Sequence, residues 1–302
     1  MSTNLNHKKA LVISGGGSKG AFAGGVAEYL LLKQNNKYDI FLGTSTGSLL
    51  ISHLALNKVE EIKRIYTNVS QDDIFSNCPF TKRKKKGFTH VGINHFNVLI
   101  NFLLGSRTFG ESKNLRKLIE KEITREIYDE IRQVHKEVVV TVSNLTTNEV
   151  EYKNISEVEY EDFCDWIWLS CNYPPFMSLV HKNGYDYADG GLSITAPIER
   201  AIEMGATEID AIILDTETYA INHMPIKNAF ALLTNTFTFM MNTISFQGLQ
   251  LASRRAKYEN VKLNMIHTPT ILTTNSLVFD KVEMTKWWQQ GYDYALFNSA
   301  KK

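Results

Sequence analysis

The chain has 302 residues, with 33 Lys or Arg and 32 Asp or Glu, so its formal net charge of +1 excludes a general attraction for nucleic acid. Its hydrophobic content of 43% with 22% charged residues is ordinary for a globular protein and can supply a sizeable core. The three cysteines, Cys78, Cys164 and Cys171, form no C-x-x-C motif and cannot all pair, which favours a reducing compartment over a disulfide scaffold.

The chain begins with a polar stretch, 1–9, and the apolar run that follows stops at Gly15. This run is too short for the apolar region of a signal peptide, and no later stretch reaches the ~18 apolar residues of a membrane span. We therefore predict a cytoplasmic protein that is at most peripheral to a membrane. Secretion without a cleaved signal stays open.

The first sixty residues alternate between short β-prone runs and helical patterns. The predicted order is strand 10–14, glycine loop 15–20, helix 21–33, strand 39–42, turn 43–47 and helix 48–56. Short apolar runs without alternation are typical of buried parallel strands. This order predicts an α/β fold with three layers, α/β/α, and a mainly parallel central sheet.

The remaining chain continues the alternation. The pattern predicts helices at 58–71, 94–104, 112–132, 158–169, 198–204 and 280–298, two more within 225–257, strands at 136–143, 148–153, 209–214 and 261–267, a short Tyr-rich stretch at 185–188 and a loop at 77–92. Repeats, low-complexity tracts and linkers are absent from the sequence. We predict a single domain, 1–302, with a motif-bearing part at about 8–215 and a helical C-terminal part at about 225–302 packed on it.

The turn Gly43-Thr44-Ser45-Thr46-Gly47 matches G-x-S-x-G and lies between a predicted strand and a predicted helix. This is the context of a nucleophile elbow, in which the serine hydroxyl projects at a helix N-terminus. Gly43 and Gly47 leave room for the strand and the helix to approach each other. Ser45 is therefore a candidate nucleophile.

The glycine loop, in which Gly15, Gly17 and Gly20 match G-x-G-x-x-G, has two interpretations. A dinucleotide site also needs an acid at the end of the second strand, and Asp39 stands at the wrong end. A phosphate-binding P-loop fails because Ala21 and Phe22 occupy the places of Lys and Ser/Thr. The better interpretation is an oxyanion hole made by the backbone amides of Gly15, Gly16 and Gly17. Lys19 could add a positive charge there or be an ordinary surface lysine.

Ser45 needs a proton acceptor, and two candidates remain. Among the eight histidines, His267 is the best placed, because it ends the strand predicted at 261–267. Asp189 is followed by Gly190 and Gly191, which leave its carboxylate accessible, although a D-G pair also marks an ordinary turn. An aspartate with a pKa of about 3.9 is a weak base unless burial raises its pKa.

Three ordered motifs, 15–20, 43–47 and Asp189-Gly190-Gly191, together resemble the patatin-like phospholipase family. The segment 170–176 is similar to the family's S-x-x-x-P-x-F segment, and the strand at 136–143 to its central strand. The resemblance covers about the first 215 residues. It implies a serine lipid acyl hydrolase, of phospholipase A or lysophospholipase type, that works through an acyl-serine.

The resemblance also implies the site. Ser45 would be the nucleophile and Asp189 its base, without histidine, while Lys19 and the amides of 15–17 stabilise the oxyanion. Gly20, Gly43, Gly47, Gly190 and Gly191 would support these motifs. Lys19 stands where the family often has arginine, which puts a bidentate role in doubt, and Cys171 where it commonly has another small residue.

Alternatives in other classes are an acyltransferase with the same dyad and a non-catalytic relative that binds a lipid or a protein partner. Two apolar stripes are best explained as core faces, or else as contacts for alkyl chains. They are Phe96, Leu99, Phe102 and Leu103, and Phe230, Leu233, Phe237, Met240 and Met241. The basic run Lys82–Lys86 is either a solvated loop or a contact for anionic lipid. The sequence implies no cofactor and no metal site; the implied substrate is a phospholipid or another acyl-ester lipid.

Overall fold

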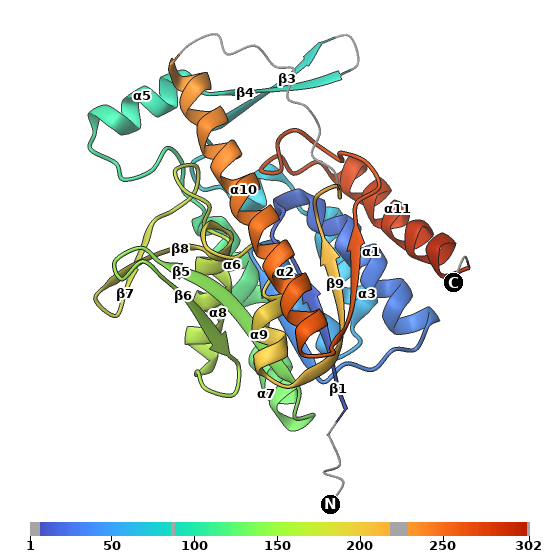
Figure 1. Ribbon diagram of the computed structural model, residues 1–302. Coiled ribbons are helices and arrows are strands. Elements are labelled where there is room, and N and C mark those ends of the chain that lie inside the picture. Colours follow the sequence, from blue (N-terminus) through green and yellow to red (C-terminus); the bar gives the residue numbers. More distant parts are fainter. Residues whose placement is uncertain (1–6, 86–87, 218–228, 301–302) are drawn as a thin grey trace, which may run out of the picture.

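The computed structural model describes residues 7–85, 88–217 and 229–300, which are organised around an eight-stranded sheet (Figure 1). The strand order is β10-β9-β1-β2-β5-β8-β7, and β6 also pairs with β5. The strands are β1 (Lys8–Ile13), β2 (Ile40–Thr44), β5 (Glu137–Asn144), β6 (Glu149–Asn154), β7 (Val180–Lys182), β8 (Tyr185–Asp189), β9 (Ala206–Ile213) and β10 (Lys262–His267). The pairs from β10 to β5 are parallel, whereas β6 and β8 run antiparallel to β5. The predicted mainly parallel sheet is confirmed.

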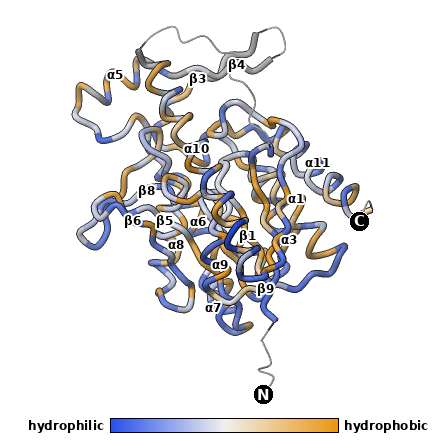
Figure 2. The backbone as a smooth tube through the Cα atoms, in the orientation of Figure 1, coloured by the Kyte–Doolittle hydropathy of each residue, from blue (hydrophilic) through white to orange (hydrophobic). Residues whose placement is uncertain are grey.

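Helices cover both faces of this sheet because its strands are apolar on both sides. Leu11 and Ile13 of β1 belong to one apolar cluster, while Ala10 and Val12 belong to a second cluster. The first face is covered by α1 (Gly20–Glu28), α2 (Thr46–Ala55), α3 (Val59–Asn68), α6 (Lys113–Glu122), α7 (Arg125–Gln133), α8 (Tyr160–Ser170) and α11 (Lys281–Ser299), and the second by α9 (Ile198–Glu203) and α10 (Ala229–Tyr258). Figure 2 shows hydrophobic segments running through the centre of the molecule. The three-layer α/β/α prediction is confirmed.

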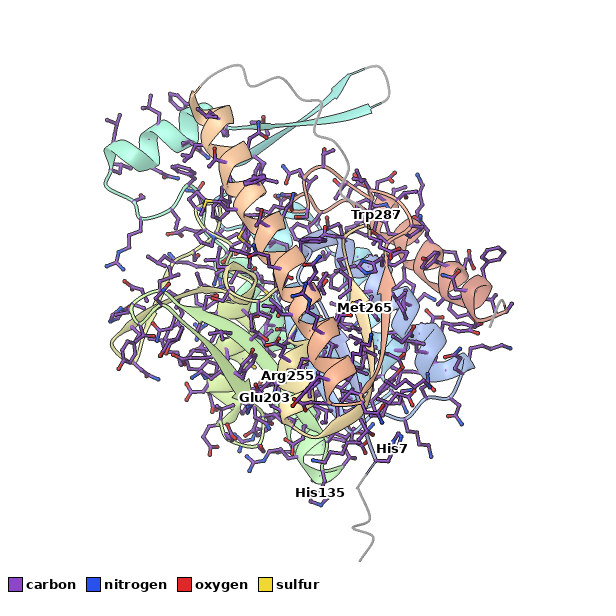
Figure 3. The ribbon with its side chains drawn as sticks, viewed as in Figure 1. His7, His135, Glu203, Arg255, Met265 and Trp287 are labelled. Carbon is purple, nitrogen blue, oxygen red and sulfur yellow. The ribbon has the colours of Figure 1, made fainter. Side chains whose placement is uncertain are left out.

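The C-terminal segments pack directly on the motif-bearing part. Trp288 of α11 is 1% exposed, and its indole nitrogen donates a hydrogen bond of 2.6 Å to Glu28 of α1. Arg255 of α10 forms a 2.9 Å ion pair with Glu203 of α9, and the two labelled side chains lie together in Figure 3. β10 completes the sheet beside β9. These contacts favour the single domain 1–302, which stays a prediction.

Three predicted elements differ from the structure. The loop predicted at 77–92 contains an antiparallel hairpin of β3 (Phe80–Lys85) and β4 (Phe88–Ile93), because β-prone residues of β4 pair with the basic strand. The helix predicted at 112–132 is broken into α6 and α7 at Thr124, whose side chain caps α7 by accepting a hydrogen bond from Ile127 N. The two helices expected within 225–257 are one 30-residue helix, α10, after residues 218–228, which lie outside the described ranges.

The smaller elements are α4 (Gln71–Ile74), α5 (His95–Leu103), the short 3₁₀ helices η1 (Gly17–Lys19) and η3 (Gly190–Leu192), and the π-helical turn η2 (Tyr29–Lys33). The core assignment preferred for the two apolar stripes is wrong: Phe96 is 72%, Leu99 55% and Leu103 74% exposed on α5. On α10, Leu233 is 63% and Met240 53% exposed, whereas Phe237 and Met241 are half-buried. The side chains of Phe102, Phe230 and Lys82–Lys85, and the whole of Lys86, lie outside the described part.

Candidate active site

Ser45 lies in a sharp turn between β2 and α2, with φ of 53° and ψ of −120°. A positive φ is strained for a residue with a side chain, and the surrounding packing must hold it. A Cβ built on Gly43 would lie 2.5 Å from Ser48 N, and one built on Gly47 would lie 2.9 Å from the backbone carbonyl carbon of Ile13, so both positions require glycine. The predicted strand, turn and helix are confirmed. Ser45 is 8% exposed and is the residue that precedes the first residue of α2. At this helix N-terminus the helix dipole favours negative charge.

The central strand β5 brings Asp189 to Ser45. Thr44, the last residue of β2, is registered with Thr141 of β5, and Asp189, the last residue of β8, is registered with Val142. Since β6 pairs with β5 along 139–144, β2 and β8 share the other edge of β5 and run toward each other. Two motifs that are distant in the sequence therefore meet end to end at this edge.

The Asp189 carboxylate is buried and its protonation is shifted accordingly. Asp189 is 3% exposed, and one of its oxygens, Oδ1, accepts a 2.7 Å hydrogen bond from Gly191 N. Burial raises the pKa of Asp189 to about 7, while side-chain hydrogen bonding with Ser45 and the Gly191 amide lower it in part. Because a general base works best with a pKa near the operating pH, burial removes the weakness expected of a free aspartate.

The glycine loop lies beside Ser45 and presents two free amides. A Cβ built on Gly15 would lie 3.3 Å from Cβ of Ser45. The Gly15 amide already donates to Thr195 O at 3.0 Å. Within the described ranges, no acceptor takes the amide hydrogens of Gly16 and Gly17. The backbone donors available for an oxyanion are therefore those of Gly16 and Gly17.

Tyr66 of α3, which the sequence analysis did not single out, ties this loop to the elbow. It is 5% exposed, and its hydroxyl donates a 3.0 Å hydrogen bond to Gly17 O and is bonded to the Thr46 hydroxyl. Burial raises the pKa of this phenol above its usual value, so it stays protonated at neutral pH. A single side chain thus fixes the spacing between the loop and the residue after Ser45. A tyrosine on an amphipathic helix carries no sequence signal for such a role.

The ammonium group of Lys19 is directed to Asp215, which lies shortly after the end of β9, with Nζ 2.6 Å from Oδ1. The lysine is 15% exposed and the aspartate 43%. Lys19 follows the free amides of the loop in η1, but the structure pairs its charge with this carboxylate. A direct contact of Lys19 with the oxyanion stays a prediction.

His267 does not join Ser45 and Asp189. It ends β10, which is separated from β2 by β9 and β1. At about 4.8 Å between neighbouring strands, three steps across the sheet are roughly 14 Å. Its Nδ1 lies 3.2 Å from the backbone oxygen of Asp215. The sheet order therefore argues against a triad built on His267.

The last residue of α8 and the two residues after it hold both members of the Ser45–Asp189 pair. Ser170 Oγ accepts a 2.9 Å hydrogen bond from Ser45 N and donates to Thr141 O at 2.7 Å. The Cys171 thiol donates to Ser45 O at 3.2 Å, and Asn172 O accepts from Asp189 N at 2.8 Å. Burial raises the pKa of Cys171, and the Asp189 charge raises it further, so this thiol stays neutral and inert.

Comparison with known families shows which family the chain belongs to. The family model Patatin, described as patatin-like phospholipase, matches residues 11–202, which include the glycine loop, the elbow and Asp189. The match spans well over half of the chain. The chain belongs to the patatin-like phospholipase family. The patatin-like family in general consists of lipid ester hydrolases.

A solved structure extends the likeness to the whole fold. The crystal structure of VipD from Legionella pneumophila superposes with a TM-score of 0.53 at 14% identity and covers 96% of this chain. The match spans 66% of the VipD chain, so this patatin-like chain corresponds to less than two thirds of that protein. At this identity the likeness concerns the fold alone. No curated protein matches the chain.

Two further properties bear on the chemistry. Among the residues that the structure describes, no three His, Cys, Asp or Glu side chains gather as a metal site would require. Across the same ranges, every helix lacks the combination of length and apolarity needed to cross a bilayer.

Proposed function

We propose that this patatin-like chain hydrolyses carboxylic esters of lipids with Ser45 as nucleophile and Asp189 as general base. The observation that carries the proposal is the buried Asp189, with its pKa raised to about 7, hydrogen-bonded with the serine of a strained elbow. A fixed, nearly neutral-pKa carboxylate beside a hydroxyl is the arrangement that activates a weak nucleophile. Membership of the family supports lipid esters, phospholipids among them, as substrates.

The geometry supports a two-step reaction. Asp189 takes the proton of Ser45 as Oγ attacks the ester carbonyl, and the carbonyl oxygen gains charge beside the amides of Gly16 and Gly17. Asp189 then gives its proton to the leaving alcohol, which departs and leaves an acyl-serine. A water molecule, deprotonated by Asp189, attacks the acyl-serine, and the proton returns to Ser45 as the acid leaves. One missing oxyanion donor costs about 3 kcal/mol in such reactions.

The experiment uses the purified full chain, a series of short-chain and long-chain acyl esters, and a fluorophosphonate that labels activated serines. We expect Ser45→Ala to lose the label and to lower kcat by roughly four to six orders of magnitude. Asp189→Asn should lower kcat by roughly three to four orders with an unchanged circular dichroism spectrum, because the serine keeps its place but loses its base.

His267→Ala is the matched control, because it removes the other candidate base. It should behave like the parent protein, since His267 lies three strands away from Ser45 in the sheet. Hydrolysis at the parental rate by Ser45→Ala would refute the proposal. A large loss of activity in His267→Ala would show that His267, and not Asp189, is the general base. A parent protein inert on every ester and unlabelled would favour the non-catalytic alternative. If an added alcohol accepts the acyl group from the acyl-serine faster than water does, the acyltransferase alternative would be favoured.

A further inference from the structure

Helix α5 is inverted relative to an ordinary surface helix. Its two inner asparagines face the protein: Asn97 donates to Asn77 Oδ1 at 3.2 Å, and Asn101 donates to Phe109 O at 2.9 Å. Three of its large apolar residues face outward: Phe96, Leu99 and Leu103 are 72%, 55% and 74% exposed. These three positions have the spacing that forms one stripe on a helix. A helix normally buries such a stripe.

Helix α10 shows the same inversion. The residues that it buries are small: Ser245 is 5% exposed, and Ala252 and Ala256 are each 2% exposed. Large apolar residues form two neighbouring rows on its outer side, spaced seven positions apart. The rows are Leu232 with Phe239, at 52% and 69% exposed, and Leu233 with Met240, at 63% and 53%. No charged residue occurs between 229 and 253 of the sequence.

The two helices belong to one end of the molecule and reach the same loop. Figure 1 draws α5 and the start of α10 at the end opposite the N-terminus. Phe237 of α10 packs on Tyr173 with ring centres 5.5 Å apart. On the other side, Phe109, which α5 binds through Asn101, packs on Phe176 at 6.2 Å. We call the seven exposed residues the outer apolar face: Phe96, Leu99, Leu103, Leu232, Leu233, Phe239 and Met240.

The loop between these helices is continuous with the proposed active site. Tyr173 follows Asn172, whose carbonyl accepts the Asp189 amide hydrogen at 2.8 Å. Burial raises the pKa of Tyr173, and the nearby Asp189 charge raises it further. A second contact, a 2.9 Å hydrogen bond, joins Ser245 of α10 to Thr195, the residue whose carbonyl holds the glycine loop. The outer apolar face is therefore joined to Ser45 and Asp189 through this loop and through Thr195.

We propose that the outer apolar face rests on the surface of an anionic phospholipid bilayer and so delivers lipid to Ser45. The proposal rests on the proposed function, because a lipid hydrolase must reach a substrate that is itself part of the bilayer. Exposed apolar side chains at one end of a molecule, combined with basic residues in the same chain, are what binds such a membrane. The sequence places five consecutive basic residues, 82–86, shortly before α5, and they complement anionic headgroups.

The test is flotation of the full chain with vesicles of phosphatidylcholine, with and without phosphatidylserine. All proteins carry Ser45→Ala, so the measurement needs no catalysis and stays valid if the proposed function fails. The test variant combines Leu99→Gln, Leu103→Gln, Leu233→Gln and Met240→Gln. The matched control changes four residues of similar exposure outside α5 and α10: Leu32→Gln, Val134→Gln, Val282→Gln and Leu296→Gln.

We expect the parent and the control to float with phosphatidylserine vesicles, and the test variant to lose roughly two orders of magnitude in partitioning. Weaker flotation of the parent without phosphatidylserine supports the contribution of the basic run. Equal flotation of the test variant and the control would overturn the proposal. The proposal would also be overturned if the parent did not bind vesicles but sedimented as an oligomer, and the test variant sedimented as a monomer. The outer apolar face would then be an interface between copies of this chain.

Discussion

At the proposed active site, polar groups are buried and hydrogen-bonded, whereas on α5 and α10 large apolar groups are exposed and polar or small groups turn inward. Asp189 is 3% exposed and accepts the Gly191 amide hydrogen, while Leu103 is 74% exposed on the outer apolar face. Both regions depart from the usual distribution of residues in a soluble protein. Each departure lowers stability or solubility, and each therefore indicates a function.

The buried carboxylate and the exposed apolar face serve different purposes. A buried carboxylate raises its own pKa and so becomes a usable base, which is a local effect inside one protein. An exposed apolar face gains nothing until another surface covers it, which is an effect between molecules. A short motif can encode the first, because the groups that act are few. The second needs only a pattern of burial, which appears once the fold is known.

The prediction with the largest expected effect tests whether Asp189 is a buried charge. Its pKa rises from 3.8 to about 7 in the folded chain, so between these values the folded state binds more protons than the unfolded state. The contribution of Asp189 to stability is therefore fully present below about pH 4 and is lost as pH rises through about 7. The loss is at most about 4 kcal/mol.

Asp189→Asn removes this dependence while keeping an acceptor for the Gly191 amide. We expect the free energy of unfolding of the variant, measured by urea denaturation, to exceed that of the parent by a margin that grows from pH 5 to pH 8. Over the same range, kcat/KM of the parent should fall about tenfold per unit below pH 7, as the base becomes protonated. A margin that is independent of pH would show that Asp189 is not a buried charge at neutral pH.

Much of the fold and the site could be predicted from the sequence because their signals are local. The elbow, the glycine loop and the three layers follow from apolar runs bounded by glycine turns. The meeting of Ser45 and Asp189 followed from the family resemblance rather than from spacing, because it depends on β2 and β8 sharing one edge of β5. No pattern along the chain contains that register.

Other features were beyond sequence patterns for physical reasons. Tyr66 looks like any apolar residue of a helix until its hydroxyl is seen on Gly17 O. The Gly15 amide is occupied by Thr195, which lies far along the chain. Phe96, Leu99 and Leu103 of α5 have the spacing of a core helix, and only the fold reveals that they face outward.

A second prediction sharpens the account of the buried polar site. Tyr66→Phe removes the hydroxyl that joins Gly17 O to Thr46 and should lower kcat by roughly tenfold to a hundredfold with little change in KM, because the loop amides drift from the oxyanion. The matched control is Tyr128→Phe, which removes another buried hydroxyl, bonded to Val158 O at 2.5 Å, far from the glycine loop.

Both substitutions should lower the free energy of unfolding by about 1 kcal/mol. Steady-state kinetics on a dissolved ester separates the two, since only Tyr66→Phe should change kcat. Equal kinetics for the two variants would reduce Tyr66 to a structural role.

The smallest expected effect compares the two sides of α5. Asn101→Leu removes the 2.9 Å hydrogen bond to Phe109 O and leaves that carbonyl without this donor, so the free energy of unfolding should fall by about 1 kcal/mol. Leu99→Gln, on the outer side and 55% exposed, should change it by no more than about 0.5 kcal/mol. In an ordinary surface helix the order would be reversed, with the apolar position the more sensitive. Urea denaturation of the two variants decides, and a larger loss for Leu99→Gln would mean that the outer apolar face is packed against the protein rather than free to meet a membrane.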